Sequence, residues 1–436
     1  MWNLWKYGNR PALKDNYGHM LTYNDIRSIA KVIKSRYGTR NLVYFRATND
    51  IWSIANYIAL LQTKQTIILV DDKVKEEYHN HYKKIFFPNM VFEQNQLTLR
   101  NGLMPWVNPK LALLLPTSGS TGDSKFVRIS YKNIKANIKS VLDFLPIDKN
   151  ERPILSLPMS YVFGLSVINS HIAAGACIYV TDQPCYSKQF WQFANENKCT
   201  SFSNVSAAYE MMLKFGFPVS DSMKYFSHSG GRLNDRTITK INELCKKHNI
   251  DFYRMYGTTE CMSRMTYLPP NESDAPSGCV GRPVKNGKIK IVDGKIVYSG
   301  PNVAMGYASC YHQLLLDDYW NGIFESGDIG YIDETGALHI QGRESRFTKQ
   351  YGYRYSLDDL ENVIETHWNC ECMIKIRYDD FLVIGITENI PQKELIQWLR
   401  ENDYLIGECL VQWYPELPHN LNGKKDYKNF DKQEES

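Results

Sequence analysis

The stretch TSGSTGDSK, residues 117–125, follows the apolar run LALLL at residues 111–115 and precedes FVRI at residues 126–129. Both apolar runs have the composition of strands, so a loop is predicted between them. Its glycines let the backbone approach a ligand and point several N–H groups one way, and its hydroxyls and Lys125 add donors. The loop therefore favours a polyphosphate over a solvated turn. It is not a Walker loop, because Ser124 stands where that pattern requires glycine.

On both sides of this loop, apolar runs alternate with helical patterns. Strands are predicted at residues 42–45, 66–70, 126–129, 154–157, 177–180 and 252–255, and helices at residues 51–62, 131–145, 162–174 and 237–248. Such alternation predicts an α/β fold, with parallel-type sheets covered by helices. Ligands of parallel sheets gather beyond the carboxyl ends of the strands. The loops expected at that edge are residues 116–125, 158–164, 229–233 and 256–260.

The pattern changes near Gly281. Short strands are predicted at residues 288–292, 295–298 and 337–340, between turns rich in Gly, Asn and Asp. These features favour a small antiparallel β unit. A compact α+β segment, with a helix predicted at residues 357–364, follows Gly342 and Arg343.

Composition narrows the class of protein. A chain of 436 residues predicts two or three domains. Its net charge of +4 is spread over interspersed acidic and basic residues, so no nucleic-acid partner is expected. No apolar run approaches membrane-spanning length, and stable membrane insertion is not expected. The ten cysteines are irregularly spaced, without a CxxC pair, and the N-terminus has no signal-peptide pattern. These features favour a cytoplasmic protein with reduced thiols.

Two further motifs follow predicted strands. The run YGTTE, residues 256–260, offers an aromatic face, two hydroxyls and the carboxylate of Glu260. A carboxylate beside a phosphate loop commonly serves Mg²⁺, and the alternative is a polar turn. The run SGGR, residues 229–232, is a bare backbone against which a flat base could lie, and the alternative is a tight turn.

Three later features are ambiguous when taken singly. Asp328 follows a glycine, so its carboxylate could accept hydrogen bonds from ribose hydroxyls or could simply belong to a turn. Gly342 and Arg343 begin a basic strip that also fits a solvated loop. Lys424 follows a Gly turn near the C-terminus, where a lysine is usually solvated.

Together, the order and spacing of these motifs resemble the adenylate-forming superfamily, from about Leu111 to Lys424. That superfamily comprises acyl-CoA synthetases, aryl-CoA ligases, stand-alone adenylation domains and beetle luciferases. The resemblance implies a large adenylation domain at residues 1–342, in which residues 1–110 form a shortened N-terminal subdomain and residues 281–342 the small β unit. It implies a small, mobile α+β lid domain at residues 343–436. Members use ATP to convert a carboxylic acid to an acyl-adenylate with release of pyrophosphate, and a thiol then displaces AMP.

The resemblance also implies residue roles, with ATP and Mg²⁺ bound in the site. The phosphates would be held by Thr117, Ser118, Gly119, Ser120, Thr121, Gly122 and Lys125. The remaining nucleotide contacts would come from Gly230, Gly231, Arg232, Tyr256, Gly257, Thr258, Asp328 and Arg343. Tyr256 would stack on adenine, while Asp328 and Arg343 would hold the ribose. The catalytic group would comprise Thr259 at the α-phosphate, Glu260 at Mg²⁺, and Lys424 between the carboxylate and the α-phosphate, where an ammonium offsets developing negative charge.

The lid and the acid pocket follow from the same resemblance. Ser345 stands at the hinge, where the family usually has Asp or Lys, and Gly352 would line the thiol tunnel in the second pose. The acid pocket would include Tyr161, Phe163, Gly164 and Ser229, although Phe163 also fits plain helix core. Amino-acid-activating members carry an Asp in the segment that corresponds to residues 157–169. This chain has no acidic residue there, so an α-amino acid is disfavoured.

Three functions remain open at this point. The leading hypothesis is an acid–thiol ligase whose thiol is CoA or the phosphopantetheine of an acyl carrier protein. The second is an adenylation enzyme that passes its acyl group to an amine or activates an amino acid. The third is a nucleotide-binding module without catalysis. Ser124, Ser345 and the short lid favour it, and the intact Lys125, Glu260, Asp328, Arg343 and Lys424 oppose it.

Overall fold

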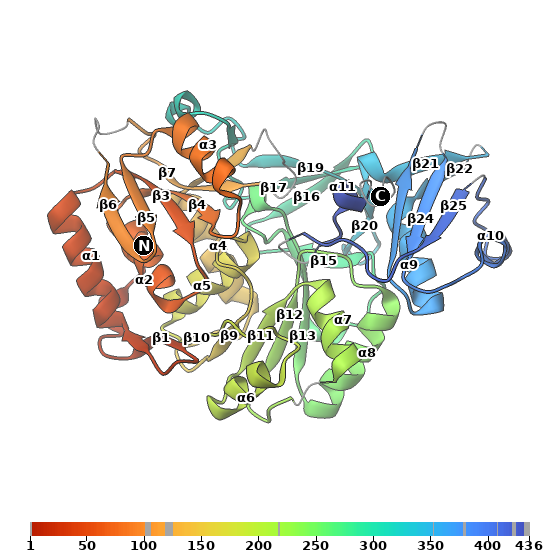
Figure 1. The fold of residues 1–436 in the computed structure, drawn as a ribbon, viewed down its shortest axis with the longest axis horizontal. Helices are drawn as coiled ribbons and strands as arrows, with labels where there is room; N and C mark the ends of the chain where they lie inside the picture. Colours follow the sequence, from red (N-terminus) through yellow and green to blue (C-terminus); the bar gives the residue numbers. More distant parts are fainter. Residues whose placement is uncertain are drawn as a thin grey trace.

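The computed structural model describes residues 2–100, 106–117, 125–216, 219–351, 353–377, 381–407, 409–420 and 424–430. Within these residues the chain forms a seven-stranded sheet, a thirteen-stranded sheet and two small sheets. In Figure 1 the seven-stranded sheet lies at the left, the green strands of the larger sheet at the centre, and the C-terminal strands, in blue, at the right.

The seven-stranded sheet carries the strand that ends at the Ser/Gly loop. Its strand order is β18-β8-β7-β4-β3-β5-β6. Its parallel strands are β3 (Leu42–Ala47), β4 (Thr66–Asp71), β5 (Met90–Glu93) and β7 (Leu111–Pro116). Its antiparallel strands are β6 (Gln96–Leu99), β8 (Phe126–Ser130) and β18 (Tyr307–Ala308). The sheet is therefore mixed, because the loop after β7 is short enough to return the chain antiparallel as β8.

The thirteen-stranded sheet has a parallel part and an antiparallel part. The parallel part comprises β1 (Pro11–Asp15), β10 (Ile178–Val180), β9 (Pro153–Leu155), β11 (Ser201–Asn204), β12 (Tyr225–His228) and β13 (Asp251–Tyr256), with β2 (Met20–Thr22) antiparallel at the edge. The antiparallel part comprises β14 (Thr266–Leu268), β15 (Cys279–Pro283), β20 (Leu338–Arg343), β19 (Ile323–Ile332), β17 (Lys295–Ser299) and β16 (Lys288–Val292). The predicted β unit is thus antiparallel, and it continues the large sheet through β14 and β15.

Helices cover both faces of each sheet. They are α1 (Tyr23–Tyr37), α2 (Ile51–Gln62), α3 (Glu76–Phe86), α4 (Tyr131–Phe144), α5 (Val162–Ala174), α6 (Lys188–Glu196), α7 (Ser206–Phe215), α8 (Asp235–His248), α9 (Leu357–Trp368), α10 (Gln392–Glu401) and α11 (Tyr427–Phe430). The main core joins α2, α4 and α5 to facing residues of both sheets, while α3 covers the far side of the first sheet and α6 to α8 the far side of the second. Every residue of α5 from Val162 to Ile172 is buried, so this mostly apolar helix lies inside the molecule.

Local capping explains why several helices begin where the sequence predicts. Asp50 caps α2 by accepting from the backbone N–H groups of Trp52 and Ser53. Ser130 and Asn133 form a reciprocal capping box at the start of α4. These caps start α2 three residues after β3 and α4 directly after β8, as the strand–helix alternation predicts.

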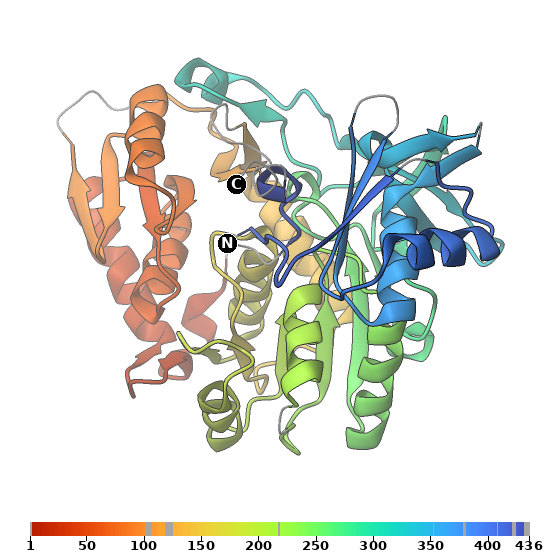
Figure 2. The ribbon, with the colours of Figure 1, turned by 45° about the vertical axis from the view of Figure 1, so that its right-hand side comes forward.

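The C-terminal region has its own strands and its own core. β21 (Phe347–Gln350) pairs with β22 (Tyr353–Ser356), while β24 (Leu382–Ile386) lies between antiparallel β23 (Cys372–Ile376) and parallel β25 (Cys409–Trp413). Apolar residues of α9, α10 and these strands pack together, among them Leu360, Ile384 and Leu395. Figures 1 and 2 both place this region beside α7 and α8 of the larger sheet.

The α/β fold class predicted from the sequence is confirmed. Three details differ: the first sheet is mixed rather than parallel, the β unit extends the larger sheet, and the strand predicted at residues 154–157 is the shorter β9, Pro153–Leu155. Among the helices described, none combines the length and apolar character that crossing a membrane requires.

Candidate active site

The two large sheets meet at Tyr307. This residue opens β18 in the first sheet, and its hydroxyl donates to Glu260 Oε1 at 2.7 Å, just beyond β13 of the second sheet. Lys125 Nζ lies 5.9 Å from the centre of the same ring. The lysine of the predicted phosphate loop and the carboxylate of the predicted Mg²⁺ site are therefore neighbours, although 135 positions apart in the numbering of the chain.

The phosphate loop is described only at its base. The backbone N–H of Thr117 donates to the carbonyl of Lys125 at 3.1 Å, which holds the two ends of the loop together. Ser118, Gly119, Ser120, Thr121, Gly122 and Ser124 lie outside the described residues.

The SGGR run follows β12 and passes close to other backbone and side chains. Ser229 is buried, and Gly230 has a φ of 91°, which favours glycine. A Cβ on Gly230 would lie 2.2 Å from the Tyr161 hydroxyl, and one on Gly231 would lie 2.8 Å from Ser206 Oγ. The bare backbone predicted beside a flat base is therefore required by the close approach of Tyr161.

Tyr256, Asp328 and Arg343 form one polar group. The Tyr256 hydroxyl donates to Asp328 Oδ2, and Arg343 Nε lies 3.3 Å from Asp328 Oδ1. The β19–β20 register sets Asp328 opposite Arg343, so the hairpin itself brings the two predicted ribose residues together. Burial raises the pKa of Asp328, while Arg343 and the Tyr256 hydrogen bond partly offset that effect.

The YGTTE run turns sharply after β13. Thr259 and Glu260 lie in the short 3₁₀ helix Thr259–Cys261, with Thr258 as its N-cap residue. A Cβ on Gly257 would lie 2.3 Å from the carbonyl carbon of Ser263, so glycine is needed where the chain folds back. Only Oε1 of Glu260 has a hydrogen bond among the described residues, which fits a carboxylate with an oxygen free for Mg²⁺.

Lys424 enters this site from the C-terminal region. Its Nζ lies 5.6 Å from the centre of the Tyr161 ring. Burial, and to a smaller extent the charge of Arg343, lower its pKa to about 8, while Asp328 and Glu260 oppose the shift. The residues that influence its charge are thus the predicted ribose and Mg²⁺ residues, and the ammonium lies among them.

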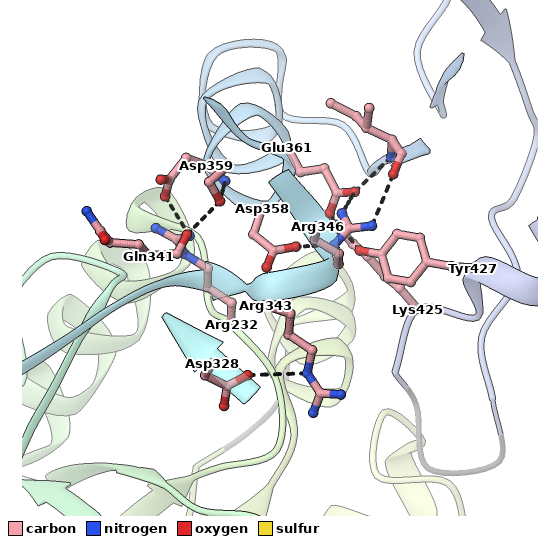
Figure 3. Close-up of polar contacts among 12 residues, drawn as sticks. Arg232, Asp328, Gln341, Arg343, Arg346, Asp358, Asp359, Glu361, Lys425 and Tyr427 are labelled. Carbon is pink, nitrogen blue, oxygen red and sulfur yellow. Dashed lines mark hydrogen bonds and ion pairs between the residues drawn. The ribbon is translucent and has the colours of Figure 1, made fainter. Parts of the chain in front are cut away.

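The neighbouring Lys425 points into the C-terminal region instead. Its Nζ lies 2.9 Å from Glu361 Oε2 and 2.7 Å from Glu365 Oε1. Arg346 pairs with Glu361 and with Asp358, and the Tyr427 hydroxyl donates to Glu361 at 2.8 Å. Figure 3 shows Arg346 between the two acidic groups, with Tyr427 and Lys425 alongside. This buried network fixes the segment that presents Lys424.

Arg232 makes a direct ion pair with the C-terminal region. Its Nη1 lies 2.7 Å from Asp359 Oδ1 of α9, and its Nε donates to Ser277 Oγ at 2.8 Å (Figure 3). Nearby, Asn362 Nδ2 donates to Asp235 Oδ2 at 3.2 Å. The residue expected beside adenine is therefore engaged in holding α9 against the start of α8.

The predicted acid pocket lies at the start of α5. Tyr161 is the N-cap residue of that helix, and Phe163 is buried in the main core, as the plain-core alternative expects. A Cβ on Gly164 would lie 2.4 Å from the Pro158 carbonyl, so packing of α5 on the preceding turn accounts for this glycine. Ser345, the predicted hinge, is exposed in the 3₁₀ turn Glu344–Arg346, and Gly352 lies outside the described residues.

Comparison with known proteins now identifies the family. Residues 43–308 match the profile of the family described as AMP-binding enzyme, which is more than half of the chain. The chain belongs to that family. The resemblance expected from the sequence motifs is thereby confirmed.

Individual relatives are distant from this AMP-binding enzyme. The 2-succinylbenzoate–CoA ligase of Listeria innocua is 27% identical over 262 residues, which are 59% of this chain and 55% of the relative. The chain thus spans about half of the length of the first curated relatives that it matches. Among solved structures, the O-succinylbenzoate coenzyme A synthetase (MenE) of Bacillus subtilis in complex with AMP has a TM-score of 0.80 at 19% identity, covering 97% of this chain and 96% of that one. ATP-bound MatB from Rhodopseudomonas palustris has a TM-score of 0.81 at 17% identity, with coverages of 98% and 96%. The two structures show a shared fold.

Two residues of this AMP-binding enzyme's site escaped sequence reasoning. Tyr307 lies on a two-residue strand after a turn, with no motif around it. Asp359 lies in the first turn of α9, where an acidic residue is common because it stabilises the positive end of the helix dipole. Only Asp359 could have been suspected from the sequence, because it lies in the first helix after Gly342 and Arg343.

Proposed function

We propose that this protein is an ATP-dependent acid–thiol ligase. It would convert a small carboxylic acid to an acyl-adenylate with release of pyrophosphate, and then pass the acyl group to a thiol with release of AMP. The observation that carries the proposal is the position of Lys424. A lysine from the end of the chain lies over Tyr161, among the charges of Arg343, Asp328 and Glu260.

The roles of the protein's own groups follow from this geometry. The Asp328 carboxylate, oriented by Tyr256, would accept from ribose hydroxyls, and Lys125 would lie at the phosphates. Glu260 would hold Mg²⁺, which supplies positive charge at the phosphates when bound. Lys424 would offset the negative charge that grows on the α-phosphate as the carboxylate attacks, which is where electrostatic stabilisation lowers a barrier most.

The domain roles remain part of the proposal. Residues 1–342 would be the adenylation domain, with residues 1–110 as its shortened first subdomain, and residues 343–436 would be a lid that rotates about Ser345. The pose described here brings Lys424 into the site, which suits the first half-reaction. The thiol would be CoA, as the names of the relatives suggest for those proteins. All ten cysteines lie in the described residues without a disulfide, which supports a cytoplasmic location.

Acid-dependent pyrophosphate release tests the function. The protein would be given ATP, Mg²⁺ and a panel of carboxylic acids, with and without CoA. We expect one acid or acid class to release pyrophosphate, and steady AMP formation to require CoA. Pyrophosphate release that transfers the acyl group to an added amine instead would favour the amine-acceptor alternative. Nucleotide binding without release for any acid would contradict the ligase.

The lowered pKa of Lys424 predicts the pH dependence. Its pKa is about 8 in the folded protein, so the ammonium is present below that pH and is lost as pH rises through it. We expect kcat/KM for ATP, which reports the free enzyme, to fall about tenfold per pH unit above about 8. Lys424→Arg should remove this alkaline limb because guanidinium stays charged. If Lys424→Arg keeps the same fall in kcat/KM above pH 8, then another group causes that fall.

The proposed role of Glu260 as an Mg²⁺ ligand predicts how its replacement changes the Mg²⁺ requirement. Glu260→Gln keeps an acceptor for Tyr307 but removes the charge, so the Mg²⁺ concentration for half-maximal pyrophosphate release should rise about tenfold or more. Tyr307→Phe is the matched control, because it removes the hydrogen bond and leaves the carboxylate. Its effect should be smaller. Equal Mg²⁺ profiles for wild type and Glu260→Gln would rule out a metal role for this residue.

The Arg232–Asp359 pair predicts coupling between the adenylation domain and α9. Arg232→Gln and Asp359→Asn should each slow pyrophosphate release, and the double variant should be no worse than the slower single one. The coupling should be about 0.5–1 kcal/mol, as for partly exposed ion pairs. The Arg282–Glu272 pair, also 2.7 Å, is the control, and Glu272→Gln should leave the rate unchanged. Additive effects would mean that Arg232 acts only on the nucleotide.

A further inference from the structure

A small cavity lies at the edge of the first sheet where β4 and β7 begin. Its walls include Thr66 at the start of β4, Leu111 at the start of β7 and Tyr131 at the start of α4. The phosphate loop follows the other end of β7, so the cavity is separate from the candidate active site. Its volume is about 180 Å³. Pockets for drug-sized ligands take about 300–1,000 Å³, so this cavity suits a small ion rather than a nucleotide.

Two cations line this cavity. Arg40 comes from the segment between α1 and β3, and Lys64 comes from the turn between α2 and β4. Lys64 Nζ lies 4.3 Å from the centre of the Tyr131 ring. Burial raises the pKa of Tyr131, and the charge of Arg40 opposes that rise, so both cations act on the same phenol. Within the described parts of the chain, neither cation has an ion pair and none of the lining residues is acidic.

The carboxylate next to this region is already engaged. Asp317 Oδ1 accepts from Nδ2 of the lining residue Asn108 at 3.1 Å, and it lies 3.2 Å from Lys110 Nζ. Its charge is thus paired with a lysine that does not line the cavity. The charges of Arg40 and Lys64 remain uncompensated within the lining. Like charges that share a site repel each other, and a bound anion would offset both.

Hydrogen bonds fix the segments that carry the two cations. The backbone N–H of Arg40 donates to the carbonyl of Lys64 at 3.1 Å, which joins the two segments directly. Gln65 is fully buried, and its Oε1 accepts from the N–H of Asn41, the residue after Arg40, at 2.7 Å. The Tyr131 hydroxyl donates to the Gln65 carbonyl at 2.7 Å. The backbone of the site is therefore formed before any ligand arrives, which lowers the cost of binding.

We propose that this cavity binds inorganic phosphate or pyrophosphate between the guanidinium of Arg40 and the ammonium of Lys64. A guanidinium offers paired donors that match two oxygens of a phosphate group, and an ammonium adds a compact charge. Two cations also match an anion with two or more charges better than they match a monocarboxylate. The proposal does not rest on the proposed function, because none of these residues has a role in the adenylation reaction.

Protection of Lys64 from acetylation tests the site at the level of a single residue. The protein would be treated with an N-hydroxysuccinimide ester of acetic acid, with millimolar phosphate or pyrophosphate or with sodium chloride at the same ionic strength. Mass spectrometry would measure the acetylation rate of each lysine. We expect either phosphate ion to slow acetylation of Lys64 about fivefold or more, while Lys240, exposed on α8, reacts unchanged. The ion that protects at the lower concentration is the preferred ligand.

Arg40→Gln is the matched variant, because it removes one cation and leaves Lys64 to report on binding. The phosphate concentration for half-maximal protection should rise about tenfold or more, as for loss of a hydrogen bond to a charged group. The thermal unfolding midpoint should not change, since Arg40 is exposed.

Four results would overturn the site. They are no protection by either ion, equal protection in Arg40→Gln, equal protection by sodium chloride or acetate, and equal protection by ATP, which would assign Lys64 to a nucleotide. None of them bears on the ligase, because the assay needs neither an acid substrate nor turnover.

Discussion

Replacement of Lys424 by alanine is expected to slow acid-dependent pyrophosphate release by about a hundred- to a thousandfold. The ammonium is the cation that the C-terminal region brings to the reacting groups, and its charge counts most when negative charge builds on the α-phosphate. The ATP dissociation constant should change by less than about threefold, since Asp328, Arg343 and the phosphate loop do not depend on Lys424. Stopped-flow pyrophosphate assays and equilibrium ATP binding would measure the two quantities.

The controls for this prediction come from the other lysines. Lys288→Ala, on the exposed strand β16, should leave the rate unchanged. Lys424→Arg should retain part of the rate because the charge remains. Lys425→Ala is no neutral control, since its ammonium pairs with two carboxylates. Normal pyrophosphate release by Lys424→Ala would contradict the assignment of this lysine to catalysis.

Replacement of Lys425 by alanine should instead destabilise the C-terminal region, by about 3–5 kcal/mol. The change leaves Glu361 and Glu365 buried with less positive charge nearby. Burial raises the pKa of Glu361, and Lys425 and Arg346 outweigh that effect and hold it below its usual range. Chemical unfolding followed by the fluorescence of Trp368 and Trp398, which pack together in this region, would measure the loss.

A second substitution makes this prediction specific. Glu365→Gln in the Lys425→Ala background removes the carboxylate that has lost its cation partner, whereas Glu361 keeps Arg346, so it should recover part of the stability. In the wild-type background the same change should be mildly destabilising. An unfolding free energy of Lys425→Ala equal to wild type would show that the network in Figure 3 does not hold this segment.

Local patterns carried much of the fold prediction. The bounds of α2 and α5 agree with the predicted helices because capping residues act locally, with Asp50 before α2 and Gly175 after α5. Strand direction could not be read in the same way. Phe126–Ser130 has the composition of a parallel strand, but it returns antiparallel because the nine residues between Pro116 and Phe126 are too few for a crossover connection. Strands that pair can lie far apart in the sequence, so the junction of the β unit with the larger sheet could not be predicted either.

The site was predictable where motifs carry the chemistry. Glu260, Asp328, Arg343 and Lys424 were named from the sequence, and the structure brings them together. The ion pair between Arg232 and Asp359 was missed because each residue has an ordinary local explanation.

The central claim is that a carboxylate oxygen attacks the α-phosphorus of ATP in this site. An acid that supports pyrophosphate release would be labelled with ¹⁸O in its carboxylate and incubated with ATP, Mg²⁺ and CoA. Mass spectrometry of the products would follow the label. We predict AMP that carries one ¹⁸O atom, because thiolysis breaks the bond between the acyl carbon and the transferred oxygen. Label that appears in inorganic phosphate with formation of ADP, or AMP that carries no label, would contradict the account.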